Sequence, residues 1–300
     1  MEPLCAGVRD FSIYEVGPRD GLQNLPHVVS VDDRIRLVEM LSKAGLEDIE
    51  AASFVNPRTV PSMAGAAKVI RGCRGVDARL SALVPNAHGL HDAMGAGVEY
   101  FNIFLSGDES FNQRNLGKNL RQAVDDYDTM LEVNEVPLSK VRVYVSLAFS
   151  TAFDKVESAI YEAQRLGYKI VLGDTDGTAT PDRVRQVIGM VEDEDRTALH
   201  LHYGEDKCSD ATQKRMDENL TVAYECGVRE FDASISGLGG CPFVRDSHGN
   251  LDTLDLIRWA DQEGLDCGLR ADDLTQVWAF ADGIRARQNR DETLWHHNQW

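Results

Sequence analysis

Short apolar runs alternate with amphipathic stretches along almost the whole chain, and this alternation restricts the fold more than any other feature. The eight runs cover residues 11–16, 48–50, 79–84, 100–105, 141–147, 169–172, 198–202 and 230–234. Because parallel neighbouring strands need crossover helices, a run-then-helix order predicts a parallel sheet. Eight such units are typical of a (β/α)8 barrel, which usually takes about 250 residues.

The stretches between the runs carry helix-end signals. Ser30 followed by Asp33 is a capping pattern ahead of an apolar face, and Gly167 closes another amphipathic stretch. Thr180 and Pro181 open a further helix, since proline fits the first helical position. Each helix leads to the next run, as the barrel requires.

The fold class is therefore predicted to be α/β, a TIM (β/α)8 barrel with a C-terminal helical extension. Residues 1–300 are interpreted as one domain, in which 268–300 form a C-terminal helix, near 272–287, and a polar tail. An open doubly wound sheet is the main alternative. It usually has a GxGxxG turn after its first strand, and Gly17-Pro-Arg-Asp-Gly21 does not match that pattern.

The formal net charge of -18 argues against binding to nucleic acid or to anionic membranes, which depends on basic patches. No apolar run approaches the ~20 residues of a membrane helix, and the start of the chain has no secretory pattern. The six cysteines include no CxxC pair, so free thiols and a cytoplasmic location are expected.

Charged and metal-binding side chains follow several of the runs. In a barrel, the residues just after each strand form the active-site rim. These residues are Arg19, Asp20, Glu50, Asp174, His200 and His202, with Asn250 beyond the eighth run. We therefore expect them to gather at one end of the barrel.

His200 and His202 are the strongest indication of a metal. Two positions apart on a strand, they point to the same face and can reach a common ion. A carboxylate such as Asp20 together with imidazoles suits a divalent cation, and Asn250 could add an amide oxygen. A bound dication would stabilise an enolate oxygen. The alternative is a pair of hydrogen-bonded rim histidines without a metal.

Two further residues allow more than one role. Arg19 presents a fork of donors suited to a carboxylate or carbonyl oxygen, or pairs with Glu50, and the two roles are compatible. Cys241 lies in the glycine-rich loop 236–242, where a thiol with a shifted pKa can act as acid or base. Composition alone favours a small buried residue beside Pro242.

Several motifs in order carry a resemblance to a known family. They are Val16-Gly-Pro-Arg-Asp-Gly-Leu-Gln-Asn24, Ser53-Phe-Val-Asn-Pro57, Gly173-Asp-Thr-Asp-Gly177, His200-Leu-His202, Gly237-Leu-Gly-Gly-Cys-Pro-Phe243 and Gly249-Asn250. With these motifs the chain resembles the 3-hydroxy-3-methylglutaryl-CoA lyase family, in the wider group of metal-dependent barrel lyases and Claisen-type synthases. The resemblance spans residues 11 to about 265.

The resemblance implies a role for each matched residue. Asp20, His200, His202 and Asn250 match the metal ligands, and Arg19 matches the arginine that polarises the substrate carbonyl. Glu50, Asp174 and Cys241 match catalytic residues, the last overturning the composition-based interpretation. Gln23 and Ser53 are expected to bind substrate. The implied reaction is retro-Claisen cleavage of a 3-hydroxy acyl-CoA to acetyl-CoA and acetoacetate with Mg2+ or Mn2+, in a homodimer.

Two loops depart from the family pattern. Tyr203 and the polar residues after it replace the usual Asp-Thr-x-Gly, and residues 146–153 are shorter and lack cysteine. Since loops set substrate choice in barrels, the same metal-enolate chemistry on another 3-hydroxy acyl-CoA, or on a hydroxy acid without CoA, in cleavage or condensation, stays open. The CoA phosphates would need basic groups. Arg58, Lys68, Arg71 and Arg74 are candidates, although a solvated helix face explains them equally well.

Two other classes of function share part of this pattern, a metal-dependent hydrolase and a non-catalytic binding protein. Metal-dependent hydrolases of the barrel type place the His-x-His pair on the first strand, whereas here it lies on the seventh. A non-catalytic relative would have lost ligands, whereas all the matched ones are present. A lyase is therefore the favoured class.

Overall fold

Eight parallel strands close into a barrel in the computed structural model, which describes residues 9–204, 209–239 and 248–297. The barrel strands are β1 (Ser12–Glu15), β2 (Asp48–Ser53), β3 (Arg79–Leu83), β4 (Tyr100–Ser106), β5 (Val141–Ser146), β6 (Lys169–Gly173), β7 (Thr197–His200) and β9 (Glu230–Ala233). Neighbours in that order are hydrogen-bonded, and β9 pairs with β1 to close the ring. The predicted (β/α)8 barrel is confirmed.

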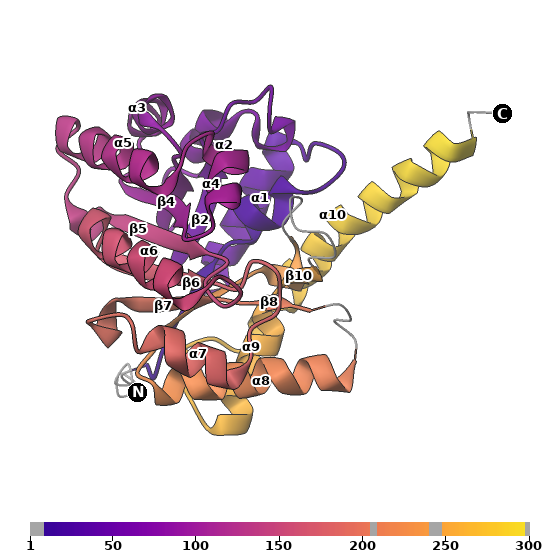
Figure 1. Ribbon diagram of the computed structural model, residues 1–300. Helices are drawn as coiled ribbons and strands as arrows, with labels where there is room; N and C mark the ends of the chain where they lie inside the picture. Colours follow the sequence, from indigo (N-terminus) through magenta and orange to yellow (C-terminus); the bar gives the residue numbers. More distant parts are fainter. Residues whose placement is uncertain (1–8, 205–208, 240–247, 298–300) are drawn as a thin grey trace, which may run out of the picture.

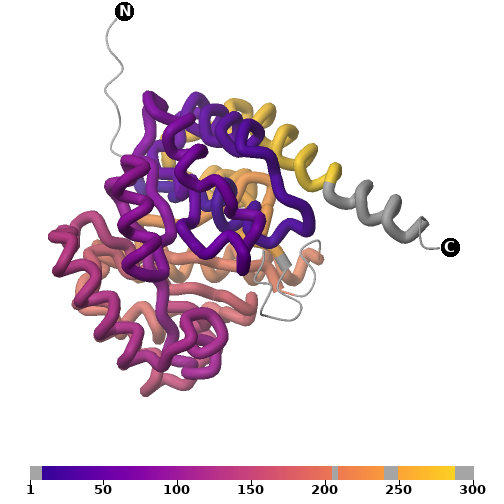
Figure 2. The backbone as a smooth tube through the Cα atoms, turned by 90° about the horizontal axis from the view of Figure 1, so that it is seen from above, coloured from indigo at the N-terminus to yellow at the C-terminus, as the bar shows by residue number. Residues whose placement is uncertain are grey.

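Helices surround the barrel, as both views show (Figures 1 and 2). They are α1 (Val31–Lys43), α2 (Ala66–Gly72), α3 (Ala87–Ala96), α4 (Glu109–Leu116), α5 (Leu120–Val133), α6 (Phe153–Leu166), α7 (Pro181–Ile188), α8 (Asp210–Glu225), α9 (Thr253–Glu263) and α10 (Ala271–His297). The predicted caps form: Ser30 Oγ accepts from the Asp33 amide, and Thr180 Oγ1 accepts from the Arg183 amide. Among the described residues, no helix is long and apolar enough to cross a membrane.

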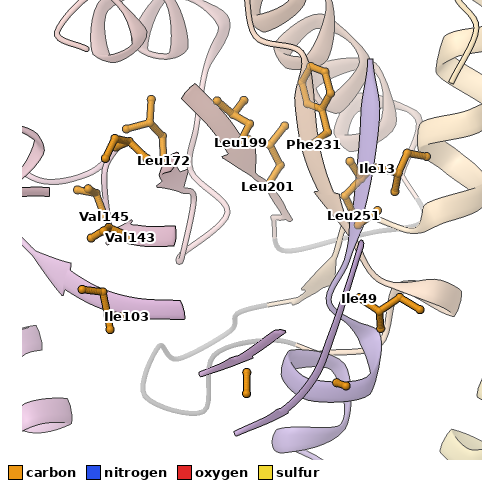
Figure 3. Packing of buried hydrophobic residues seen from close by; sticks show 14 of the residues in the cluster. Ile13, Ile49, Ile103, Val143, Val145, Leu172, Leu199, Leu201, Phe231 and Leu251 are labelled. Carbon is orange, nitrogen blue, oxygen red and sulfur yellow. The ribbon is translucent and has the colours of Figure 1, made fainter. Parts of the chain in front are cut away.

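The main core lies between the strands and the helices. Alternate residues of each strand point outward into it, as Figure 3 shows for Ile103, Val143, Val145, Leu172 and Leu199. Burial of such β-branched and leucine side chains is what a strand covered by helices requires. The odd-numbered valines of β5 thus face the helices, and its even-numbered residues face the barrel interior.

The barrel interior is unusually polar. A small apolar group of Tyr144, Val171 and Ala198, with Phe104 against it, fills part of it. Other inward positions carry buried polar or charged side chains, among them Glu50, Ser81, Asn102, Arg142 and Asp232. Buried charges are costly unless paired and hydrogen-bonded, so their partners decide what the interior can do.

Two elements differ from the sequence prediction. The run 198–202 is not one strand: β7 ends at His200, and His202 begins β8 (His202–Tyr203). β8 leaves the barrel and pairs antiparallel with β10 (His248–Asn250). In this pairing His202 lies opposite Asn250. The C-terminal helix α10 runs to His297, past the predicted end near residue 287, and leads away from the barrel (Figure 1). Residues 288–297 contain no glycine or proline that would stop it.

Candidate active site

The turn after β1 positions the first two candidate residues. Gly17–Gly21 form a single helical turn whose entrance is fixed by Glu15, which accepts hydrogen bonds from the Gly17 amide at 2.8 Å and the Thr253 hydroxyl at 2.7 Å. A Cβ on Gly17 would lie 2.5 Å from Glu15 Oε1, so a glycine is required there. Burial raises the pKa of Glu15 to about 7.

Arg19 lies buried between two carboxylates. Its Nε donates to Glu50 Oε2 at 2.6 Å, and its Nη1 donates to Asp20 Oδ1 at 2.7 Å. Burial alone would lower the pKa of Arg19, but the two carboxylates outweigh it and hold the guanidinium charged. Glu50 is fully buried and also accepts from Asn102 Nδ2 at 2.7 Å. The salt bridge with Glu50 that the sequence left open therefore exists, and it fixes the direction of the guanidinium.

The two rim histidines face each other. His200 Nε2 and His202 Nε2 are 3.1 Å apart, and Asp20 Oδ2 lies 3.9 Å from His200 Nε2. One ligand atom from each of the three residues lies within 4.8 Å of the others, a group that could hold a metal ion. Two imidazole lone pairs this close repel unless a proton or a cation lies between them. The contact is therefore either a hydrogen bond between the two rings, as a structural pair would make, or the place of a bound cation.

The outer nitrogens of both rings are already used. His202 Nδ1 lies 3.1 Å from the Thr175 carbonyl oxygen, which can only accept, so Nδ1 carries the hydrogen. His200 Nδ1 lies 3.1 Å from Asp232 Oδ2. Burial, reinforced by the neighbouring His200, lowers the pKa of His202 to about 4. A neutral ring with Nδ1 protonated presents its Nε2 lone pair, which is the form that binds metals.

Asn250 completes the group. It stands on β10 opposite His202, and its Nδ2 donates to Asp20 Oδ2 at 2.8 Å and to the Leu238 carbonyl at 2.9 Å. Its Oδ1 is buried and accepts no hydrogen bond from the described residues. An orphaned buried oxygen beside a carboxylate and two imidazoles fits a cation, since it would otherwise cost about 1–3 kcal/mol.

A cavity of about 120 Å³ opens onto these residues. Arg19, Asp20 and the two histidines form its charged side, and Leu83, Phe104 and Phe111 form an apolar wall. Polar side chains of Gln23, Asn24, Asn115 and Ser146 also line it. Such a space suits a small acid with charged oxygens at one end and an alkyl substituent at the other.

Of the other predicted site residues, some line the cavity and some do not. Gln23 lines the cavity, and its buried Oε1 has no partner among the described residues. Ser53, also buried with an unpartnered hydroxyl, lies in a neighbouring groove. The Asp174 carboxylate turns away and accepts from the amides of residues 178 and 179 at 2.9 and 3.0 Å. Cys241 lies outside the described residues.

Sequence reasoning missed the residues behind the rim. Asp232 and Tyr144 contact His200, and Asn102 contacts Glu50, yet each of the three lies within a strand and not at its end. The signal that could have found them is the period-two pattern. In Val141-Arg-Val-Tyr-Val145 the polar residues alternate with apolar ones in a strand that helices cover.

A closed parallel barrel with a carboxylate, two imidazoles and a buried arginine at its strand ends defines a barrel enzyme with a candidate metal centre. The HMGL-like family model matches residues 10–281. A 3-hydroxy-3-isohexenylglutaryl-CoA/hydroxy-methylglutaryl-CoA lyase of Pseudomonas aeruginosa is 36% identical over 258 residues, covering 82% of this chain and 83% of that protein. The chain belongs to the HMGL-like family.

Solved structures of HMG-CoA lyases have the same fold as this chain. The HMG-CoA lyase of Brucella melitensis superposes with a TM-score of 0.83 at 32% identity, covering 93% of this chain and 100% of that one. An HMG-CoA lyase of Acinetobacter baumannii, in complex with coenzyme A and 3-methylmalate, gives a TM-score of 0.81 at 29% identity and covers 91% of each chain. The predicted resemblance and enzyme class, a carbon–carbon lyase, are confirmed.

Proposed function

We propose that this protein cleaves 3-hydroxy-3-methylglutaryl-CoA to acetyl-CoA and acetoacetate with the help of a divalent cation. The observation that carries the proposal is the convergence of Asp20, His200 and His202 beside a buried, doubly paired Arg19. The relatives at 32% and 36% identity are named as lyases of this substrate, which supports the same chemistry here.

Asp20, His200, His202 and Asn250 would hold the cation, Mg2+ or Mn2+. Carboxylate and amide oxygens suit both ions, and imidazole nitrogens favour Mn2+ of the two. Asp20 is ionised and so can act as a ligand. Burial raises its pKa, but Arg19 and the two histidines lower it by more than burial raises it, so the net shift is downward. When bound, the cation supplies positive charge that acidifies a substrate hydroxyl and stabilises negative oxygen.

Arg19 would hold the thioester carbonyl. Its Nε and Nη1 donate to carboxylates, and no described residue accepts a hydrogen bond from its Nη2, so that donor would be free for a ligand in the cavity that Arg19 lines. A fixed donor aimed at the oxygen where enolate charge develops lowers the barrier to carbon–carbon cleavage. Glu50, held in turn by Asn102, would keep the guanidinium in that direction.

The remaining assigned residues act around this centre. Gln23, whose buried Oε1 has no partner among the described residues, would accept a hydrogen bond from the substrate hydroxyl. Asp174 would act indirectly, because its carboxylate fixes the loop after β6 that carries the Thr175 carbonyl against His202. Cys241, which matches the mobile-loop cysteine of the family, would act as an acid and supply the proton that converts the product enolate to acetyl-CoA.

A second groove supports a CoA thioester. It has a volume of about 1300 Å³ and runs from the end of β2 along α3 and α5. Of the basic residues considered for CoA phosphates, Arg58 and Arg71 line it, whereas Lys68 and Arg74 do not. No described residue binds the Arg58 guanidinium, and Ser53 lies at the end of the groove nearest the rim. We place the CoA arm there.

Turnover tests the proposal. The metal-loaded protein, incubated with 3-hydroxy-3-methylglutaryl-CoA, should yield acetyl-CoA and acetoacetate in equal amounts. Thioesters with longer substituents at C3 should react more slowly, because the cavity is small and lined by Phe104 and Phe111. Free 3-hydroxy acids should also react more slowly, because they lack the CoA arm placed in the second groove. No product from a fully metallated sample would overturn the substrate assignment. The dimer and the cytoplasmic location stay predictions.

A further inference from the structure

A second ion-pair network lies behind His200, inside the barrel. Arg142 and Tyr144 on β5 reach across the interior to Glu230 and Asp232 on β9. On each strand the two residues are two positions apart and therefore face the same side. Arg142 Nη2 donates to Asp232 Oδ1, and its Nη1 donates to Glu230. The Tyr144 hydroxyl donates to Asp232 Oδ2 at 2.8 Å. Asp232 is about 1% exposed, so this carboxylate depends on its protein partners and not on water.

The same Asp232 oxygen meets His200. Oδ2 lies 3.1 Å from His200 Nδ1, and the Tyr144 ring packs edge-on to the imidazole with centroids 5.8 Å apart. The Arg142 guanidinium is itself held over the Tyr14 ring at 3.9 Å. The carboxylate is therefore clamped on both oxygens, and the ring of His200 has one orientation that satisfies it.

This arrangement selects one form of the imidazole. A carboxylate held by a permanent cation only accepts hydrogen bonds, so His200 must offer a hydrogen on Nδ1. In the neutral ring, which is the form that binds a cation, the lone pair is then on Nε2, the atom that faces His202 and Asp20. Outer carboxylates of this kind orient metal-binding histidines and raise their basicity, and their loss typically costs 10–100-fold in metal affinity.

We propose that Asp232 is a positioning residue for the metal centre: it fixes the ring orientation and tautomer of His200, and Arg142 keeps Asp232 in place. The inference rests on the proposed function, specifically on the cation bound by Asp20, His200 and His202. It assigns a role to a strand-interior pair that touches neither substrate nor cation.

A pair of charge-neutralising variants tests the proposal. Asp232→Asn removes the charge facing His200, whereas Glu230→Gln removes the other carboxylate bound to Arg142 without touching the histidine. Mn2+ binding is measured by electron paramagnetic resonance on metal-stripped protein, with circular dichroism to check folding. We expect Asp232→Asn to weaken Mn2+ binding 10–100-fold, and Glu230→Gln to change it less than threefold.

The outcomes separate the possibilities. Equal losses in the two variants, or no loss in Asp232→Asn, would overturn the positioning role and leave Asp232 as an ion-pair partner only. Wild-type protein that binds no Mn2+ would overturn the metal site and this inference together. If Asp232→Asn fails to fold, wild-type protein loaded with Mg2+ and labelled with 15N-histidine decides the matter. The His200 signal, assigned by its loss in His200→Asn, should show hydrogen on Nδ1, and hydrogen on Nε2 would contradict the proposal.

Discussion

Asn250 donates a hydrogen bond from Nδ2 to Asp20 Oδ2 over 2.8 Å, although 230 positions separate the two residues. The contact exists because β8 leaves the barrel after His200 and pairs with β10. It joins the first βα turn to the segment after the last barrel strand, so the two ends of the barrel sequence meet at the candidate metal centre. The predictions below follow from this centre and the groups packed against it.

Asp20→Asn should abolish turnover and leave the fold intact. The amide keeps the size of the side chain but removes the charge that balances a dication. Since a bound cation supplies several kcal/mol to the transition state, we expect kcat to fall about 10³-fold or more. Steady-state kinetics at saturating Mn2+ checks this, and an unchanged kcat would refute the site.

Arg19→Met should lower stability as well as activity, because it leaves the fully buried Glu50 without its cation. Breaking a buried pair from one side costs about 3–5 kcal/mol. Adding Glu50→Gln should recover much of the free energy of unfolding and none of the turnover, since the carbonyl donor is still missing. Urea denaturation and kinetics on both variants test the pair, and full rescue of activity by the second change would contradict the role of Arg19.

Asp174 should make the wild-type protein less stable as the pH rises. Burial raises the pKa of Asp174 from 3.8 to about 7 in the folded state. Below the unfolded-state pKa both states hold the proton, and stability is lost as the pH rises towards 7, where the folded protein must ionise a buried carboxyl. Asp174→Asn keeps an oxygen for the amides of residues 178 and 179 but does not titrate. Its unfolding free energy relative to wild type should therefore increase by a few kcal/mol between pH 4 and pH 8. Parallel pH profiles would show that Asp174 does not titrate in this range.

Arg58→Gln should weaken binding of the CoA thioester. An exposed charge-assisted contact contributes about 1 kcal/mol, which corresponds to a rise in KM of threefold to tenfold. A pantetheine thioester, which lacks the nucleotide, should show no such rise. Lys68→Gln is the matched control, because Lys68 lies on α2, in the same βα unit as Arg58, but does not line the groove. If Arg58→Gln raised KM equally for the CoA and the pantetheine thioester, the nucleotide of CoA would not bind beside Arg58.

Much of the fold could be predicted from the sequence because its signals are local. Strand runs, the caps at Ser30 and Thr180, and the glycine-ended helices are set by neighbours within a few positions, and the structure confirms them. The exception is the run 198–202. Its five residues continue the pattern, but the exit of the chain after His200 depends on pairing with residues 248–250, which no local pattern encodes.

The site divides in the same way. Asp20 and His200 could be predicted because strand-end position and residue type suffice, whereas Asn250 reaches the site only through the pairing of β10 with β8. Asp232 and Asn102 could not, because their roles depend on which strands face each other across the barrel interior. The direction of the Asp174 carboxylate, away from the cavity, likewise depends on the course of the loop after β6 and not on its position in the sequence.

The most direct test of the central claim is a metal titration of stripped protein that follows binding and turnover of 3-hydroxy-3-methylglutaryl-CoA together. The account predicts that one Mn2+ binds per chain, that acetyl-CoA and acetoacetate form in proportion to the bound ion, and that His200→Ala loses both responses. Full turnover by metal-free protein, or Mn2+ binding that His200→Ala leaves unchanged, would contradict it.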